Sequence, residues 1–234
     1  MFEMFSVNMK HIYPVLVVST MSSGKSTLIN ALLGKELLPS RNTACTVRAA
    51  AVLNNDARER FGIHVVDEEG KYCFVEQDTE KVVVNYNQSN NADEIIIEGN
   101  IQGIRNSQNA FMLIDTPGLN YCLDPLHEKV TREVLDGYQK GMILYVINAA
   151  QMATNDDSNS LNLVARKIKD HPDFKVIFVI NKMDKIDPDR EDPCKLVENC
   201  RKYVHRQGIE DPILIPVSAE SALIFQKVLN KEPL

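Results

Sequence analysis

Residues 19–27 read S-T-M-S-S-G-K-S-T, a short stretch that combines a lysine and a glycine with several hydroxyl side chains. It follows the apolar run of residues 15–18 and precedes a segment of helical character. A glycine-rich turn between a strand and a helix points backbone N–H groups and the positive end of the helix at one place, which suits a phosphate group. Apart from its first position, the stretch matches the phosphate-loop pattern G-x-x-x-x-G-K-[ST]. It therefore predicts a site for a nucleoside di- or triphosphate.

The residues of this loop have different expected roles. Gly24 leaves room for the backbone to approach the phosphates, Lys25 reaches the β- and γ-phosphate oxygens, and the Ser26 hydroxyl binds Mg²⁺. Ser23 and Thr27 complete the predicted nucleotide contacts.

Ser19 stands where the pattern has its first glycine. Either the missing glycine imposes a small strain, or this turn needs no left-handed residue at that position. In both cases we expect Ser19 to matter little for nucleotide binding.

A second motif, D-T-P-G-L at residues 115–119, follows the apolar segment from Phe111 to Ile114. A carboxylate at the end of a strand can hold Mg²⁺ through a water molecule, which is the role expected of Asp115. The backbone N–H of Gly118 is placed to contact the γ-phosphate. Ordinary turns share this composition, but the position after a strand and after the phosphate loop favours a second part of the same site.

The segment L-L-P-S-R-N-T-A-C-T-V-R at residues 37–48 precedes a β-rich run. Its hydroxyls are candidates for a loop that closes over Mg²⁺ and the γ-phosphate and opens after hydrolysis. Thr46 is preferred to Thr43 because it lies immediately before the β-rich run. Arg41 and Arg48 flank the loop, and we expect them to be solvated surface residues rather than arginine fingers.

A third motif, N-K-M-D at residues 181–184, follows the apolar run V-I-F-V-I. Asp184 can accept hydrogen bonds from N1–H and the amino group of guanine, whereas adenine has no such pair of donors and would leave a buried carboxylate unpaired. Asn181 is expected to connect the base loop to the phosphate loop, and the stem of Lys182 to lie along the purine. The backbone of Ser218 and Ala219, in I-L-I-P-V-S-A, is expected to contact the guanine oxygen. Together the motifs predict a GTP site.

These motifs must be delivered by strands and helices that alternate along the chain. Apolar, β-rich runs at residues 12–18, 111–114, 142–147, 175–180 and 213–217 predict strands, and amphipathic segments at 25–33, 125–138, 158–170, 193–207 and 222–230 predict helices. Such alternation indicates an α/β fold of three layers, with a mostly parallel mixed sheet and helices on both faces. The segment 46–110 reads instead as antiparallel strands added to one edge of the sheet.

Length and composition fit a single domain over residues 1–234. The net charge of −6 and the absence of a basic cluster give no reason to expect a nucleic-acid partner. No segment reads as a signal peptide or a membrane span, so the chain is expected to be cytoplasmic. The five cysteines are scattered and include no C-x-x-C pair, which favours reduced structural thiols.

The order and wording of these motifs resemble the GTPase domain of the dynamin superfamily, and of bacterial dynamin-like proteins in particular. The resemblance lies in M-S-S-G-K-S-T-L-I-N-A-L-L-G, L-L-P-S-R-N-T-A-C-T, D-T-P-G-L and N-K-M-D, and it covers about residues 12–225. It implies a phosphate-loop GTPase fold and Mg²⁺-dependent hydrolysis of GTP to GDP and phosphate. It also implies stimulation by a homodimer that forms across the nucleotide face, and coupling to membrane remodelling.

The resemblance also carries over to single positions. Ser22 matches a serine that helps eukaryotic dynamins to hold a monovalent cation, so Ser22, Lys25 and Thr46 are the expected catalytic residues, and Ser26, Thr46 and Asp115 the expected metal ligands. Met21 stands where eukaryotic dynamins have a glutamine that orients the attacking water. Leu119 and Asn120, after Gly118, offer no such glutamine either. We therefore expect slow hydrolysis by the isolated chain.

Dynamin relatives also have a long helical stalk, for which this sequence has no candidate. The chain is therefore expected to be a fragment of a longer protein, which reaches membranes as a peripheral protein through other regions. Two other interpretations stay open. Era-like ribosome-assembly GTPases share G-K-S-T-L-I-N-A-L, D-T-P-G and N-K-x-D, and a GTP-loaded scaffold that does not hydrolyse would also fit Met21.

Overall fold

The structure is a computed structural model that describes residues 11–20, 22–38, 50–66, 72–75, 95–106, 108–118, 125–152 and 154–230. Within these ranges the strands are β1 (Ile12–Ser19), β2 (Ala50–Asn54), β3 (Gly62–Val66), β4 (Tyr72–Val75), β5 (Ile95–Gly99), β6 (Ala110–Asp115), β7 (Gly141–Asn148), β8 (Phe174–Asn181) and β9 (Ile213–Pro216). The α-helices there are α1 (Lys25–Leu33), α3 (Pro125–Asp136), α4 (Asn155–Asp170), α5 (Pro193–Arg206) and α6 (Ala219–Leu229).

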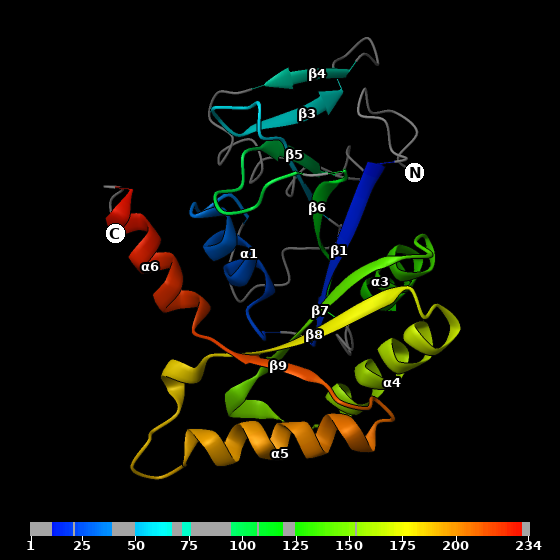
Figure 1. Ribbon diagram of the computed structural model, residues 1–234, viewed down its shortest axis with the longest axis vertical. Coiled ribbons are helices and arrows are strands. Elements are labelled where there is room, and N and C mark those ends of the chain that lie inside the picture. Colours follow the sequence, from blue (N-terminus) through cyan, green and yellow to red (C-terminus); the bar gives the residue numbers. More distant parts are fainter. Residues whose placement is uncertain are drawn as a thin grey trace.

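The strands form a nine-stranded sheet in the order β4-β3-β5-β2-β6-β1-β7-β8-β9 (Figure 1). From β6 to β9 every neighbouring pair runs parallel, as the alternation of strands and helices predicted. The register pairs Val17 with Asp115 and Asn148 with Asn181. Parallel strands in this register bring the ends of β1, β6, β7 and β8 to one edge of the sheet.

The segment between α1 and β6 extends the sheet, as predicted, but not by antiparallel pairs alone. β2 pairs antiparallel with β6, and β3 pairs antiparallel with both β4 and β5. β2 and β5 run parallel, because the chain passes through β3 and β4 before it returns beside β2. The alternation of apolar residues indicates that a segment is a strand but carries no information on the direction of its neighbour.

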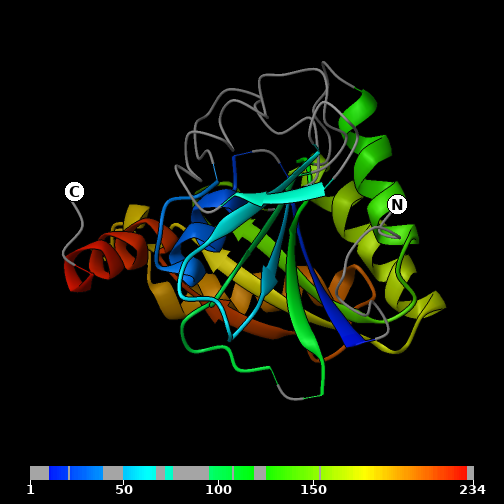
Figure 2. The same cartoon turned by 90° about the horizontal axis from the view of Figure 1, so that it is seen from above.

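Helices cover both faces of the sheet, which confirms the expected α/β class and its three layers (Figures 1 and 2). Successive residues of β1 point to opposite faces. Leu16 and Val18 belong to a core with residues of α3, α4 and α5, whereas Val15 and Val17 belong to a second core with residues of α1. These four side chains are at most 5% exposed, so β1 is a central strand buried on both faces.

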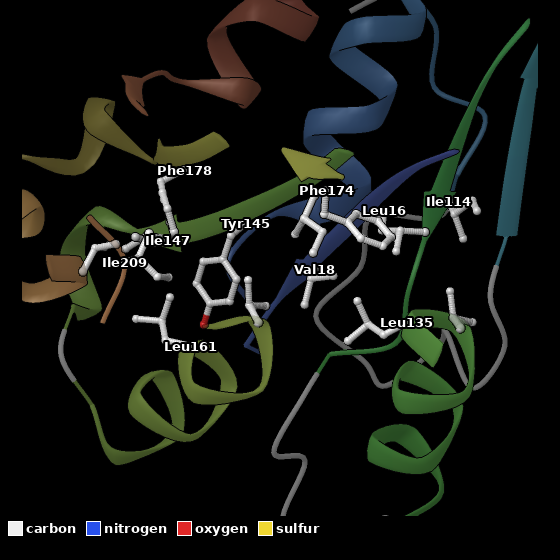
Figure 3. Close-up of a cluster of buried hydrophobic side chains, with 14 of the residues drawn as sticks. Leu16, Val18, Ile114, Leu135, Tyr145, Ile147, Leu161, Phe174, Phe178 and Ile209 are labelled. Carbon is white, nitrogen blue, oxygen red and sulfur yellow. The ribbon is translucent and has the colours of Figure 1, made fainter. Parts of the chain in front are cut away.

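The larger core gathers around an aromatic pair. Figure 3 shows Tyr145 of β7 near Leu161 of α4, with Leu135 of α3 on the other side of the cluster. Tyr145 and Phe178 are completely buried, and their ring centroids are 5.8 Å apart. Burial of side chains of this size stabilises a fold by about 1.5–3 kcal/mol each. This core therefore stabilises the strands whose carboxyl ends meet at one edge of the sheet.

Helix boundaries agree with the sequence for α1 and within two residues for α3 and α5. α4 begins at Asn155, earlier than the predicted Ser158. The side chain of Thr154 accepts a hydrogen bond from the backbone N–H of Asp157 at 3.2 Å and so caps the helix. The first turn of α4 is polar and is stabilised by this cap, so it shows no helical spacing of apolar residues. A prediction from that spacing therefore begins the helix too late.

α6 follows β9 and packs against α1 at one side of the molecule (Figures 1 and 2). Lys227 forms an ion pair with Glu36 at 2.8 Å, and Asn230 donates to the carbonyl of Gly34 at 3.1 Å. The opposite face of α6 leaves Phe225 68% exposed and Leu229 75% exposed. No helix in the described part of the chain is long and apolar enough to cross a bilayer.

Candidate nucleotide-binding site

The predicted motifs meet at the carboxyl edge of the parallel strands. β1 ends at Ser19, β6 at Asp115 and β8 at Asn181, and α1 begins directly after the loop that follows β1. Doubly wound sheets bind ligands at this edge, where loops leave the strand ends. The strand ends therefore bring the three predicted motifs to one edge of the sheet, as the sequence predicted.

The phosphate loop has its left-handed residues at its centre and not at its start. Ser22 has φ 58° and Gly24 has φ 90°, whereas Ser19 has no positive φ. Of the two alternatives for Ser19, the second is correct: the turn needs no left-handed residue there. The loop is closed by Ser23, whose buried hydroxyl donates to the carbonyl of Thr20 at 2.8 Å.

Lys25 is the first residue of α1, and its ammonium points back toward the end of β1. Nζ donates to the hydroxyl of Ser19 at 3.0 Å. Burial lowers the pKa of Lys25, and the charge of Asp115 opposes that shift only in part. The ammonium therefore lies in a place where water solvates it poorly, and an anion that enters the loop would stabilise it.

Asp115 is 2% exposed and meets the start of α1. Its Oδ2 accepts a hydrogen bond from the hydroxyl of Ser26 at 2.8 Å. Its Oδ1 is buried and has no hydrogen-bond partner among the described residues. Burial raises the pKa of Asp115, against the opposing effects of Lys25 and Ser26.

A carboxylate oxygen without a partner, next to a serine hydroxyl, fits Mg²⁺, because this ion prefers oxygen ligands and is often held by one carboxylate, waters and substrate phosphates. Ser26 and Asp115 were the two predicted metal ligands that the structure places, and it brings them together. Thr46, the third, lies outside the described residues.

The D-T-P-G turn is held by a residue that the sequence analysis did not single out. Thr116 is completely buried, and its hydroxyl donates to the carbonyl of Val17 at 2.8 Å. This bond joins the end of β6 to β1 and fixes the direction in which Asp115 enters the site. Gly118 follows as a half-buried residue at the end of this described segment.

Asn181 connects the two halves of the site, as predicted. It is 2% exposed, its Nδ2 donates to the carbonyl of Ser23 at 2.9 Å, and its Oδ1 accepts from the N–H of Ala219 at 2.9 Å. A Cβ on Gly24 would lie 2.5 Å from Nδ2 of Asn181. Gly24 is therefore required by this contact as well as by its positive φ.

The base loop differs from the prediction in two respects. Asp184 is exposed rather than buried, and its Oδ1 accepts from the hydroxyl of Ser218 at 2.6 Å while its Oδ2 pairs with Lys185 at 3.1 Å. The hydrogen bond from Ser218 lowers the pKa of Asp184, helped by Lys185 and opposed by partial burial. Ser218 thus contributes its side chain, and the N–H of Ala219 is already bound to Asn181.

The remaining predicted residues are placed as follows. Lys182 has φ 65° and precedes the short 3-10 helix Met183–Lys185, and its Cε lies 3.9 Å from the position of a Cβ on Gly24. Ser22 is exposed and Thr27 is half-buried at the start of α1. The other residues considered at the sequence level lie outside the described ranges: Met21, Arg41, Thr43, Thr46, Arg48, Leu119 and Asn120.

Sequence reasoning missed three contacts around the phosphate loop. Ser19 holds Lys25, Thr116 holds β1, and Thr20 donates to Asp157 Oδ1 at the start of α4 at 3.2 Å. The signal for Ser19 was available, because a hydroxyl at the end of a buried strand needs a partner. For Asp157 no motif was present, since its contact depends on how α4 packs.

The geometry can hold a nucleotide between a cationic end and a carboxylate end. Lys25, Ser26 and Asp115 offer a cation, a hydroxyl and a carboxylate to a metal–phosphate group. Asp184 offers two acceptor oxygens at the other end, and Asn181 fixes the loops that carry both ends. These are the donor and acceptor types that a guanine nucleotide with a bound cation would use.

Comparisons with known proteins agree with this assignment. Residues 15–183, well over half of the chain, match the model of the Dynamin family. A bacterial dynamin-like protein of Nostoc punctiforme is 26% identical over 219 residues, which is 86% of this chain and 30% of that protein. The chain thus spans less than a third of the length of this relative.

A solved structure described as an oligomerised bacterial dynamin pair that senses and tethers membranes has the same fold, with a TM-score of 0.62 and 18% identity over 92% of this chain and 34% of its own. The GTPase Era of Ureaplasma parvum is 21% identical over 93% of this chain and 64% of its own length, a weaker identity than that of the dynamin-like protein.

Proposed function

Because this chain belongs to the dynamin family and forms a GTPase domain of that family, we propose that it binds GTP with Mg²⁺ and hydrolyses it to GDP and phosphate. The observation that carries the proposal is the double hydrogen bond of Asn181, which joins the phosphate loop at Ser23 to the base loop at Ala219. These two bonds join the loop that precedes Lys25 to the segment that follows β9, which supports a single site formed by both.

At the phosphate end, the residues of the chain bind and neutralise charge. Lys25 and the backbone N–H groups of residues 23–27 face the β- and γ-phosphates, and the N–H of Gly118 contacts the γ-phosphate. Ser26 and Asp115, which contact each other at 2.8 Å, would hold the cation, with Thr46 as a third ligand. Mg²⁺, when bound there, would supply positive charge that stabilises the negative charge developing on the phosphate oxygens.

At the base end, selection of guanine rests on Asp184. Its two oxygens now accept from Ser218 and Lys185. Guanine offers two N–H donors that can replace Ser218 and Lys185 or bind the same two oxygens beside them. The bound base would also shield the carboxylate from water. Adenine has no such donors, so it would displace water from the carboxylate without adding a hydrogen bond, which costs about 1–3 kcal/mol or more for a charged group.

We propose that hydrolysis is slow in the isolated chain and faster in a homodimer. Met21 is apolar and cannot orient a water molecule, so catalysis depends on positioning and on charge neutralisation. Ser22 lies exposed in the phosphate loop, where a monovalent cation or a second copy of the chain can reach it. A partner copy across the nucleotide face would complete the site.

In the cell, we propose a cytoplasmic GTPase module that acts at membranes as a peripheral protein, through regions beyond residues 1–234. The dynamin-like protein that this chain resembles is more than three times as long as the part it shares with the chain. Neither a nucleic-acid partner nor a basic surface is part of this proposal, since the net charge is −6.

The test is the release of phosphate from GTP in the presence of Mg²⁺, measured over a wide range of protein concentration. We expect a specific activity that rises with concentration, because the dimer is the more active species. Asp184→Asn should abolish the preference for GTP over ATP, whereas Asp187→Asn, a change of an exposed aspartate three residues further on, should keep it. A flat specific activity would contradict dimer stimulation, and GTP binding without phosphate release would support a scaffold.

A further inference from the structure

We propose that Ser19 is a positioning residue for Lys25, which holds the ammonium toward the phosphates and away from Asp115. The inference rests on the proposed GTP binding and adds a residue at the one position where this loop departs from the phosphate-loop pattern. Ser19 acts through Lys25 and not on the nucleotide itself.

The hydroxyl of Ser19 is a fixed acceptor. The residue is completely buried, and Oγ donates its only hydrogen to the carbonyl of Thr20 at 2.7 Å. Because a hydroxyl has one hydrogen and two lone pairs, the remaining lone pairs are available to a donor. The donor is Nζ of Lys25, which lies 3.0 Å from Oγ of Ser19.

Without this acceptor, the ammonium has a competing partner. Asp115 attracts Lys25 electrostatically, and its Oδ1 is buried with no hydrogen bond from the described residues. An ammonium that turned to Oδ1 would occupy the carboxylate oxygen that fits a metal ion. The bond to Ser19 keeps Oδ1 open and leaves Oδ2 to Ser26.

The bond to Ser19 is compatible with bound nucleotide. An ammonium has three N–H donors, and Ser19 takes one of them. Two donors remain for the β- and γ-phosphate oxygens that a phosphate-loop lysine contacts. We therefore infer that the contact persists in the complex, so that its loss weakens binding rather than strengthening it.

A glycine at position 19 would satisfy the pattern but not this role. Ser19 has no positive φ, so the backbone conformation accepts any residue there. Glycine and alanine both leave Nζ of Lys25 without its acceptor, and they differ only in backbone freedom. This gives two independent ways to remove the hydroxyl.

The experiment measures the dissociation constants of GTP, GDP and GMP with Mg²⁺ for the wild type, Ser19→Ala, Ser19→Gly and the control Ser160→Ala. Ser160 is a serine of α4 that is 2% exposed, so the control removes a buried hydroxyl outside the site. Loss of a hydrogen bond to a charged group predicts about tenfold weaker binding of GTP and GDP for both Ser19 variants. GMP lacks the phosphates that Lys25 reaches, so its binding should change less than about twofold.

Each other outcome overturns a specific part of the argument. Binding of GTP and GDP at the wild-type level or tighter in both Ser19 variants would show that Ser19 does not position Lys25. An equal loss for GMP would show a general structural role, as would an equal loss in Ser160→Ala. Rescue of GTP affinity by Ser19→Thr, which keeps a hydroxyl, would support the positioning role. If the wild type does not bind GTP, the proposed function itself is wrong, a result distinct from unchanged binding in the variants.

Discussion

The two ends of the site treat charge in opposite ways. At the phosphate end, Lys25 and Asp115 lie where burial opposes their charged forms, with the pKa of the lysine lowered and that of the aspartate raised. At the base end, Asp184 and Lys185 lie near the surface, and hydrogen bonds and ion pairs shift their pKa values toward the charged forms. Burial therefore outweighs the attraction between the two charges at the phosphate end, whereas polar contacts outweigh burial at the base end.

The difference follows from what each end would bind. A metal–phosphate group brings charges of both signs and can compensate a buried lysine and a buried aspartate. A guanine base is neutral and brings only hydrogen-bond donors, so a carboxylate that receives it must remain stable on its own. A metal–phosphate ligand would offset the cost of burying the charges at the phosphate end, and the base end would supply selection.

The largest expected effect tests the phosphate end alone. Lys25→Met keeps the length of the side chain but removes the charge that the phosphates would compensate. We expect GTP affinity to fall about a thousandfold, which corresponds to about 4 kcal/mol. Isothermal titration with GTP measures it, and Lys202→Met in α5 is the control for loss of an exposed lysine. A loss of less than tenfold would contradict the comparison.

The next effect tests the residue that joins the two ends. Asn181→Ala leaves the carbonyl of Ser23 and the N–H of Ala219 without partners in the protein interior. We expect the free energy of unfolding to fall by about 3 kcal/mol in urea denaturation. Asn148, the register neighbour of Asn181 on β7, is the matched control, since its side chain bonds locally, accepting from the N–H of Ala150 and donating to Oε1 of Gln151. Asn148→Ala should lower the free energy of unfolding by about 1 kcal/mol. Equal losses in the two variants would show that the two hydrogen bonds of Asn181 stabilise the fold no more than a local cap does.

A smaller effect of opposite sign tests whether the buried charges are destabilising. Lys25 and Asp115 attract each other electrostatically, but burial opposes the charged form of each. Replacing interacting buried charges by neutral residues of similar shape is often neutral or stabilising by about 1–4 kcal/mol. We expect the free energy of unfolding of the double variant Lys25→Met with Asp115→Asn to be about 1–2 kcal/mol higher than that of the nucleotide-free wild type. The double variant Lys185→Met with Asp184→Asn should show no such gain. A higher free energy of unfolding in this second double variant would contradict the contrast between the two ends.

The smallest effect is a pH dependence at the base end. The hydrogen bond from Ser218 lowers the pKa of Asp184 below its ordinary value of 3.8, so it adds stability above that pH, which is lost as the pH falls through the lowered value. In Ser218→Ala the pKa of Asp184 should rise toward 3.8, as NMR titration of the carboxyl carbon would show. The hydroxyl of Ser218 also caps α6 by accepting from the N–H of Ser221 at 3.2 Å, and the loss of this cap would lower stability equally at all pH values. An unchanged pKa would assign the shift to Lys185 instead.

Much of the fold and the location of the site followed from the sequence for a physical reason. Each motif directly follows an apolar strand, and parallel strands have their carboxyl ends at one edge, so local patterns determined where Asp115 and Asn181 lie. The direction of β2 against β5 did not follow, because strand pairing depends on the path of the chain through β3 and β4.

The exposure of Asp184 and the contact of Ser19 with Lys25 were not predicted either. Both depend on distances across the loops after β1, β8 and β9, and a motif fixes residue types but not these distances. From the sequence only a backbone contact with guanine was expected of Ser218, and a serine in a turn is a weak signal by itself. Only the folded chain shows its hydroxyl 2.6 Å from the carboxylate of Asp184.

The close approach of Asn181 to Gly24 also limits how this sequence can evolve. A methyl group at position 24 would lie 2.5 Å from the amide of Asn181, so it is acceptable only if residue 181 changes too. A change at 181 removes the partners of Ser23 and Ala219. Two positions in motifs far apart along the chain therefore cannot drift separately, and among homologues we expect them to vary together or not at all.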